Sequence, residues 1–155
     1  MRNHATLHDV LTHHGSRKLF AVFIKAEYAD ESLLFYDAAA TFKATAKDQN
    51  ATELQAAAKA LCDEYISEAA SMQVNIPSKC RTDTIACLRE GGTVTDSMFD
   101  RARQECYVLM SRDTLPRFTQ SPGFIELLAY FGSYDVDKAI GGERDIELDL
   151  DLMSA

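Results

Sequence analysis

The histidines are the first candidates for metal binding or acid-base chemistry in this sequence. All four, His4, His8, His13 and His14, lie in the first fourteen residues. His4 and His8 are four residues apart, so one helical face could present both to a metal ion, but no well-placed carboxylate completes a site. No serine or cysteine nearby makes a persuasive catalytic pair with them. We therefore expect a solvated helix end and no metal site.

The four cysteines are the second group of reactive side chains. They stand at Cys62, Cys80, Cys87 and Cys106, without the C-x-x-C pairs of zinc and redox centres. Cys80 and Cys87 are seven residues apart and could share a helix face, yet the commoner role of a free cysteine is that of a small buried apolar residue. We expect free thiols in a reducing compartment, packed in the core.

Phosphate-binding loops are absent from the sequence. Neither G-x-x-x-x-G-K-[ST] nor G-x-G-x-x-G occurs. With so few acids, bases and nucleophiles at suitable spacings, the chain is not expected to be an enzyme or to carry a cofactor.

A further set of polar side chains gathers at predicted helix ends and loops. Solvated turns also carry such residues, so their presence alone does not distinguish a binding surface from an ordinary turn. The set comprises Glu31 and Ser32 after Asp30, Asn75 in QVNIPS, and Asp113 and Arg117 in LMSRDTLPRF.

The elements that carry these residues are predicted to be helices. No glycine lies between Gly15 and Gly91, and no proline lies between Met1 and Ile76, so the first half lacks the strongest helix breakers. Apolar residues recur at helical spacing, and strand alternation is absent from these segments. The pattern predicts an all-α fold with helices over about 5–13, 16–28, 31–46, 51–68, 78–90, 95–112, 114–120 and 122–131.

Helix boundaries have local signals of their own. Asp30, Asn50, Thr95 and Ser121 stand where a side-chain oxygen could cap a helix start. Glu53 follows Asn50 by three residues, which is close to a capping box. Pro122 follows Ser121 at the favoured first helical position, and Gly91–Gly92 follows a helix expected to end near Glu90.

Composition limits the classes of protein to which the chain can belong. Its 155 residues suffice for one domain, and 46% hydrophobic residues are enough for a core. A formal net charge of −8 makes nucleic acid an unfavourable partner. No signal peptide, lipid-anchor motif or apolar run of 18 residues occurs, so we expect a cytoplasmic protein without direct membrane insertion.

Residues 133–155 differ in character from the rest. They hold seven acidic and two basic side chains, and their few apolar residues are too sparse for a core. A flexible acidic tail is expected. Within it, DIELDLDL (145–152) alternates apolar and acidic residues, which would suit a strand added to a partner's sheet edge; a disordered tail with accidental alternation is the other interpretation.

Three segments, in order, resemble the regulator of G-protein signalling (RGS) domain, a likeness that runs from about Leu7 to Leu128. LFAVFIKAEYADESLLFYDAAATFK (19–43) is similar to the family's third helix, its exposed turn and the start of its fourth helix. LCDEYISEAASMQVNIPS (61–78) resembles the end of the fifth helix and the loop that presents an asparagine. YVLMSRDTLPRFTQSPGFIELL (107–128) resembles the seventh-to-ninth-helix signature.

The resemblance implies a two-lobed helical bundle of about eight to nine helices over 1–132, followed by the tail 133–155. It also implies a partner, the GTP-bound α subunit (Gα) of a heterotrimeric G protein. RGS domains accelerate GTP hydrolysis by Gα without performing chemistry themselves, and Gα could recruit the chain to the plasma membrane. By the same resemblance the residues facing Gα are Tyr28, Glu31, Ser32, Asn75, Ser78, Leu109, Asp113, Thr114 and Arg117.

The chain departs from the family pattern at several positions. The family usually has Glu-Asn where Glu31–Ser32 stands, so a shorter hydroxyl replaces an amide contact. Leu115 replaces the usual aromatic before PRF, and Tyr36 replaces the usual tryptophan of the fourth helix. Ser32 and the acidic tail keep a second interpretation open: an RGS-homology scaffold that binds a partner without stimulating GTP hydrolysis.

Overall fold

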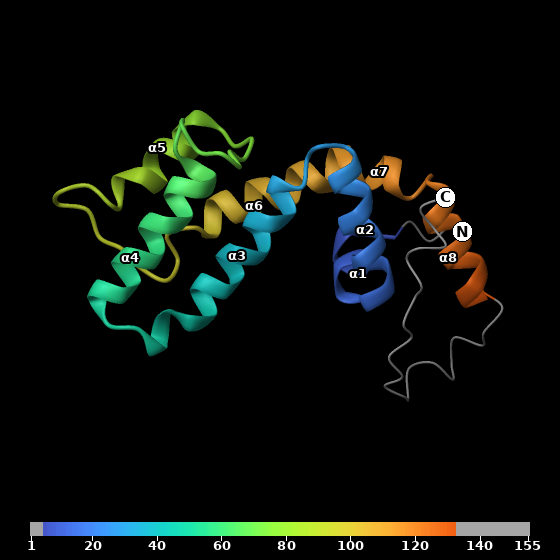
Figure 1. Cartoon of the computed structure of the whole chain (residues 1–155), viewed down its shortest axis with the longest axis horizontal. Coiled ribbons are helices and arrows are strands. Elements are labelled where there is room, and N and C mark those ends of the chain that lie inside the picture. Colours follow the sequence, from blue (N-terminus) through green and yellow to red (C-terminus); the bar gives the residue numbers. More distant parts are fainter. Residues whose placement is uncertain (1–4, 133–155) are drawn as a thin grey trace. The chain divides into compact units, whose positions relative to one another are not determined.

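The computed structural model describes residues 5–132, and every regular element in that range is helical (Figure 1). By its internal contacts the chain divides into two compact units, Met1–Ala26 with Ser111–Ala155, and Glu27–Met110. The all-α prediction is therefore confirmed for the described residues. The elements are α1 (Leu7–Thr12), α2 (His14–Ala26), α3 (Glu31–Thr45), the 3₁₀ turn η1 (Ala46–Asp48), α4 (Ala51–Leu61), the π-helical turn η2 (Cys62–Ile66), α5 (Ser78–Ala86), α6 (Asp100–Leu109), the π-helical turn η3 (Met110–Thr114), α7 (Leu115–Phe118) and α8 (Pro122–Gly132).

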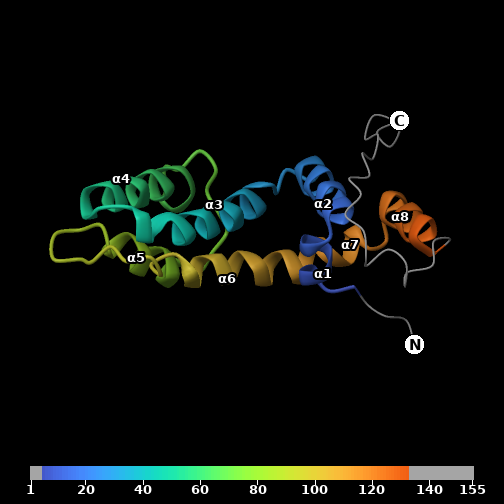
Figure 2. The ribbon, with the colours of Figure 1, turned by 90° about the horizontal axis from the view of Figure 1, so that it is seen from below.

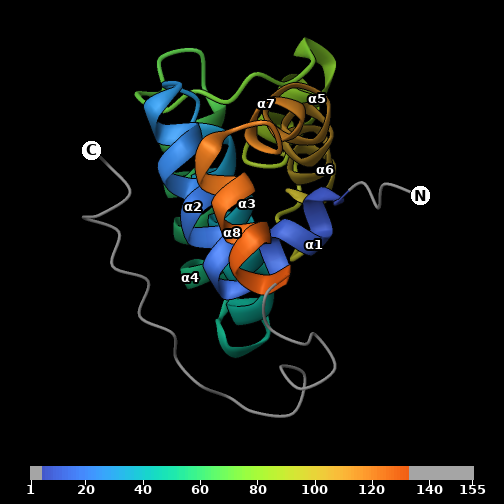
Figure 3. The same cartoon turned by 90° about the vertical axis from the view of Figure 1, so that its right-hand side faces the viewer.

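The first unit is built from α1, α2, α7 and α8. Phe118 is its central aromatic residue, with ring centroids 5.2 Å from Phe20 and 5.1 Å from Phe124. These contacts join α7 to α2 and α8, and α8 lies beside α2 (Figure 3). The remaining core residues of this unit are Leu7, Val10, Leu11, Leu19, Ile24 and Leu127.

The second unit is centred on α3, which lies alongside α4 and α6 (Figures 1 and 2). Phe99 packs edge-on against Phe42 and Phe35, at centroid distances of 5.0 and 6.0 Å. Phe35 also contacts Tyr65 of η2 at 5.6 Å. Burying several aromatic rings in one cluster supplies much of the apolar driving force for this unit. Other members of the cluster are Ala39, Ala58, Cys62, Ile66, Val74, Ile76, Cys80, Ala102 and Cys106.

Two of the four predicted helix caps are confirmed. Asn50 accepts from the Glu53 amide at 2.9 Å while Glu53 accepts from the Asn50 amide at 3.0 Å, a complete capping box. Ser121 Oγ accepts from the Phe124 amide at 3.4 Å. The cap predicted at Asp30 is wrong, because Asp30 precedes α3 but its side chain makes no capping hydrogen bond.

The cap predicted at Thr95 is also wrong. Thr95 and Ser97 share a hydroxyl hydrogen bond of 3.2 Å, and two successive turns follow before α6 begins at Asp100. The predicted helix 78–90 ends its regular part at Ala86 and continues as single turns. In the last of these the Gly92 amide donates to the Arg89 carbonyl, and Gly91 within it has a φ of +80°, which suits a glycine. The predicted helices 51–68 and 95–112 both pass into π-helical turns before they end.

Three of the four cysteines take the core position predicted for them, and Cys87 does not. All four thiols are free, Cys62, Cys80 and Cys106 are buried, and Cys87 is half-buried. Burial raises the pKa of the Cys62 and Cys106 thiols to about 12, so both stay protonated and unreactive at neutral pH.

Two of the predictions concern residues outside the described range. These residues are His4 and the tail 133–155, including DIELDLDL. Across residues 5–132, no group of three or more His, Cys, Asp or Glu side chains is placed to hold a metal ion. Within the same range, no helix combines the length and the apolar content needed to span a bilayer.

Candidate protein-binding surface

The nine residues predicted to bind a partner differ in how far solvent can reach them. Tyr28, Glu31, Ser32, Asn75, Ser78 and Leu109 belong to the second unit, and Asp113, Thr114 and Arg117 to the first. Tyr28, Asn75, Ser78, Asp113 and Arg117 are exposed, Glu31 and Leu109 are half-buried, and Ser32 and Thr114 are buried.

Asn75 stands at the apex of a tight turn. The Ile76 amide donates to the Val74 carbonyl at 3.2 Å, which closes a γ-turn with Asn75 as the central residue. The only non-glycine residue with positive φ in the described part of the chain is Tyr28, so this γ-turn is the common inverse form. Val74 and Ile76 are 1% and 7% exposed. Two buried anchors therefore hold an exposed amide between them.

The backbone before Asn75 forms hydrogen bonds with η2 and with a side chain of α5. The Val74 amide donates to the Tyr65 carbonyl at 2.9 Å, and the Met72 amide to the Glu64 carbonyl at 3.1 Å. From α5, Arg81 Nη2 donates to the Val74 carbonyl at 2.8 Å, and Arg81 Nη1 donates to the Ile66 carbonyl. The loop 67–77 is thus tied to η2 and to α5.

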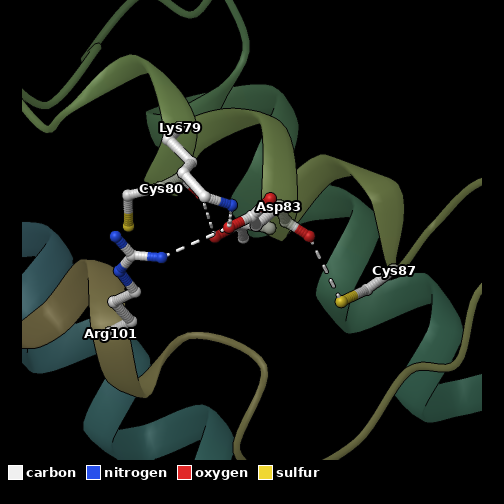
Figure 4. Close-up of polar contacts among 6 residues, drawn as sticks. Lys79, Cys80, Asp83, Cys87 and Arg101 are labelled. Atoms are coloured by element: carbon white, nitrogen blue, oxygen red, sulfur yellow. Dashed lines mark hydrogen bonds and ion pairs between the residues drawn. The ribbon is translucent and has the colours of Figure 1, made fainter.

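Helix α5, which follows the loop, is itself anchored to α6. Asp83 accepts from Lys79 at 2.9 Å on the same helix and from Arg101 of α6 at 3.2 Å (Figure 4). Both pairs are largely exposed, so they orient the helix end more than they stabilise the fold. Pro77, with φ −55° and ψ 140°, sets the entry of the chain into α5 and leaves Ser78 exposed as its first residue.

The turn before α3 carries the most exposed aromatic residue of the second unit. Tyr28 is 92% exposed and has φ +57°, a left-handed conformation that costs a non-glycine residue roughly 1–2 kcal/mol. Ser32, in the first turn of α3, is only 3% exposed. The Ser32 side chain therefore lies beneath the surface, with half-buried Glu31 beside it.

The third predicted segment contains η3 and α7. Asp113 and Arg117 are exposed, whereas Thr114 between them is 4% exposed. Residues spaced i, i+4 lie on one face of a regular helix. The π-helical geometry of Met110–Thr114 changes the angular spacing of this pair.

Three features of these segments have no signal in the sequence. The π-helical turns η2 and η3 precede Asn75 and Arg117, respectively, and were predicted as ordinary helix. The left-handed Tyr28 occupies a position where glycine would be expected. Arg81 was not singled out, because only the folded loop brings the carbonyls of Ile66 and Val74 to its guanidinium.

Comparison with known proteins assigns this arrangement to a family. Residues 6–127 match the family described as the regulator of G protein signaling domain. The chain is 32% identical over 133 residues to regulator of G-protein signaling rgs-1 of Caenorhabditis elegans, which covers 86% of this chain and 62% of that protein. It is 31% identical over 124 residues to rgs-2 of the same organism, covering 80% of this chain and 70% of that protein.

A mammalian relative is also similar to the chain, over a shorter stretch. Regulator of G-protein signaling 16 of Rattus norvegicus is 37% identical over 110 residues, covering 71% of this chain and 52% of that protein. The chain thus spans from about half to somewhat over two thirds of the length of these relatives. The match to the family takes in α1 to α7, the Asn75 loop and most of α8, and so the chain belongs to the regulator of G-protein signaling family.

Proposed function

We propose that the chain is a GTPase-activating protein for a heterotrimeric Gα subunit. It binds the GTP-bound subunit, orders the switch regions and accelerates hydrolysis, which ends the signal. The observation that carries the proposal is Asn75, an exposed amide at the apex of a γ-turn between two buried anchors, in a chain of the RGS family.

Gα supplies the chemistry in this proposal. It holds its catalytic arginine in cis and its own glutamine to orient the attacking water. What it lacks is rigidity, because its switch loops depend on the γ-phosphate for their order. A partner that binds the switch loops in their transition-state arrangement therefore accelerates the reaction without a catalytic group of its own.

Asn75 suits such a role because of its side-chain chemistry. An amide offers a carbonyl acceptor and two N–H donors, so it can contact a switch residue and the water-orienting glutamine together. A 100-fold acceleration requires about 2.7 kcal/mol of transition-state stabilisation. One hydrogen bond contributes a net of about 0.5–1.5 kcal/mol, so the rest must come from ordering of the switch loops by the whole contact surface.

The other proposed contacts fall into two groups by accessibility. The exposed and half-buried side chains can touch Gα directly, with Asp113 accepting from switch-loop donors and Leu109 giving apolar contact. Ser32 and Thr114 are buried, so in this proposal they support their segments from within. The direct contacts are Tyr28, Glu31, Asn75, Ser78, Leu109, Asp113 and Arg117.

The two units of the chain fit the two lobes of the RGS bundle, with 1–132 as the domain and 133–155 as an acidic tail. We place the protein in the cytoplasm, from which Gα would recruit it to the plasma membrane. The match over residues 6–127 supports this domain boundary.

One observation favours a second function. Ser32 is buried, so position 32 lacks the exposed amide that the family usually presents there. A chain with fewer switch contacts would act as an RGS-homology scaffold, which binds Gα without stimulating hydrolysis.

Single-turnover hydrolysis of GTP preloaded on an inhibitory-type Gα separates the two functions. A parallel binding assay would use the same Gα with GDP and aluminium fluoride, which mimics the transition state, and with GDP alone. Acceleration of hydrolysis together with preference for the fluoride state supports the activator. Equal binding of both states without acceleration supports the scaffold, and no binding to any Gα tested contradicts both.

A further inference from the structure

Arg81 joins two backbone carbonyls at the ends of the segment that leads to Asn75. One guanidinium nitrogen donates to Ile66, the last residue of η2, and the other donates to Val74 at 2.8 Å. Seven residues, 67–73, lie between these two carbonyls. Closing such a loop has an entropic cost that a single bridging side chain helps to offset.

The bond to Val74 acts directly on the conformation of Asn75. The Val74 carbonyl and the Asn75 amide belong to one planar peptide unit, so a donor that fixes the carbonyl also fixes the plane from which Asn75 projects. The same carbonyl accepts from the Ile76 amide at 3.2 Å. Arg81 and the γ-turn therefore converge on one oxygen atom.

The guanidinium of Arg81 donates hydrogen bonds to backbone carbonyls. Among the described residues no ion pair is formed by Arg81, whereas Arg101 one helix away pairs with Asp83. Hydrogen bonds from a charged donor are about twice as strong as neutral ones. The planar fork of arginine reaches two carbonyls at once, which the single ammonium of lysine does not.

We propose that Arg81 is a positioning residue for Asn75: by bridging the Ile66 and Val74 carbonyls it holds the γ-turn in the conformation in which Asn75 meets Gα. This inference rests on the proposed activator function. It predicts that Arg81 affects the rate of hydrolysis in the complex more than it affects formation of the complex, because most of the contact surface is independent of the loop 67–77.

The first test is amide hydrogen exchange in the free chain, which needs no Gα. Arg81→Gln should increase exchange at Val74 and Ile76 on the order of tenfold, since their hydrogen bonds lose the support of the bridge. Arg81→Lys, which can reach one carbonyl, should give an intermediate increase. Arg89→Gln is the matched control, because this exposed arginine makes no side-chain hydrogen bond or ion pair among residues 5–132. Unchanged exchange in Arg81→Gln would overturn the inference.

The second test uses single-turnover hydrolysis on Gα over a range of chain concentrations. We expect Arg81→Gln to lower the saturating rate constant about threefold, which corresponds to about 0.7 kcal/mol, and to change the half-saturating concentration less than twofold. Arg81→Lys should recover part of the rate. Equal losses in rate and affinity, or a loss also seen in Arg89→Gln, would overturn the positioning role. If the wild-type chain does not stimulate hydrolysis at all, the proposed function fails, while the exchange experiment still decides what Arg81 does.

Discussion

The guanidinium carbon of Arg103 on α6 lies 3.8 Å from the centre of the Tyr36 ring on α3. Arg103 Nε also donates to the Tyr36 carbonyl at 3.0 Å, and Tyr107 lies beside Tyr36 with ring centroids 5.9 Å apart. By the sequence resemblance, Tyr36 stands where the family usually has a tryptophan, and here the ring has an arginine stacked on it. The two helices at the centre of the second unit are thus joined on this side by a cation–π contact and a charged hydrogen bond.

This contact should contribute measurably to stability. We expect Arg103→Ala to lower the free energy of unfolding by about 1–2 kcal/mol, from the loss of the cation–π contact and of the hydrogen bond. Tyr36→Phe keeps the ring and should change stability little, because the hydrogen bond uses the backbone. Urea unfolding measures both. A loss in Arg103→Ala no greater than in Arg89→Ala would contradict the role given to the pair.

The capping box at the start of α4 gives a second prediction. Asn50→Ala removes an acceptor for an otherwise unpaired helix amide and should cost about 1 kcal/mol of stability. Asp30→Ala is a matched control, because Asp30 holds the corresponding position before α3 without a capping hydrogen bond. We expect it to change stability by less than about 0.5 kcal/mol. Similar losses at the two positions in thermal or urea unfolding would contradict this distinction.

The buried thiols predict how stability changes at alkaline pH. The pKa of Cys106 rises from an ordinary value of 9.0 to about 12 because burial disfavours the thiolate, with Glu31 and Glu105 adding to the shift. Between these values the unfolded chain releases the thiol proton and the folded chain keeps it. Stability is therefore complete below about pH 9 and falls as the pH rises towards 12.

Comparison of Cys106→Ala with the wild type isolates this contribution from the lysines and tyrosines that titrate in the same range. The variant is less stable at neutral pH but should lose about 1 kcal/mol less than the wild type between pH 7.5 and pH 10. Urea unfolding at the two pH values provides the measurement. Parallel losses in the two proteins would mean that the thiol ionises equally in the folded and unfolded states.

Tyr28 should affect stability and binding in opposite directions. Tyr28→Gly relieves a left-handed conformation, and after the greater unfolded-state entropy of glycine is allowed for, stability should be unchanged or rise by up to about 1 kcal/mol. Under the proposed function the same change removes an exposed aromatic contact, and affinity for Gα should fall at least about fivefold. If Tyr28→Gly destabilises the chain and leaves affinity unchanged, the tyrosine is structural.

The sequence predicted the helical elements well because the signals for them are local. Apolar spacing, the absence of Gly and Pro, and the Asn50–Glu53 box act within one or two turns of helix. The π-helical turns at Cys62–Ile66 and Met110–Thr114 did not show in that pattern, because apolar spacing over so few residues does not separate i→i+5 from i→i+4 hydrogen bonding. Thr95 does not cap a helix, because its hydroxyl shares a hydrogen bond with the Ser97 hydroxyl. Helix α6 begins five residues later, after buried Phe99.

Residue types at the candidate surface were predictable, but their exposure was not. Asn75 and Ser32 are both small polar residues at loop or helix ends, yet one is exposed and the other is buried. The difference depends on which neighbouring side chains the fold places inward, as with Val74 and Ile76. The contribution of Arg81 depends on the Val74 and Ile66 carbonyls, which lie 7 and 15 positions before it in the sequence, and no spacing rule reports it.

The central claim is that Asn75 presents its amide to Gα and thereby accelerates GTP hydrolysis. The most direct test is the saturating single-turnover rate constant of GTP-loaded Gα with the wild-type chain and with Asn75→Ala. Gln55→Ala serves as the control, since Gln55 is an exposed amide on α4 without a side-chain hydrogen bond among the described residues. We predict that Asn75→Ala lowers the rate constant about tenfold or more and that Gln55→Ala leaves it unchanged. Equal stimulation by Asn75→Ala and the wild type would contradict the claim.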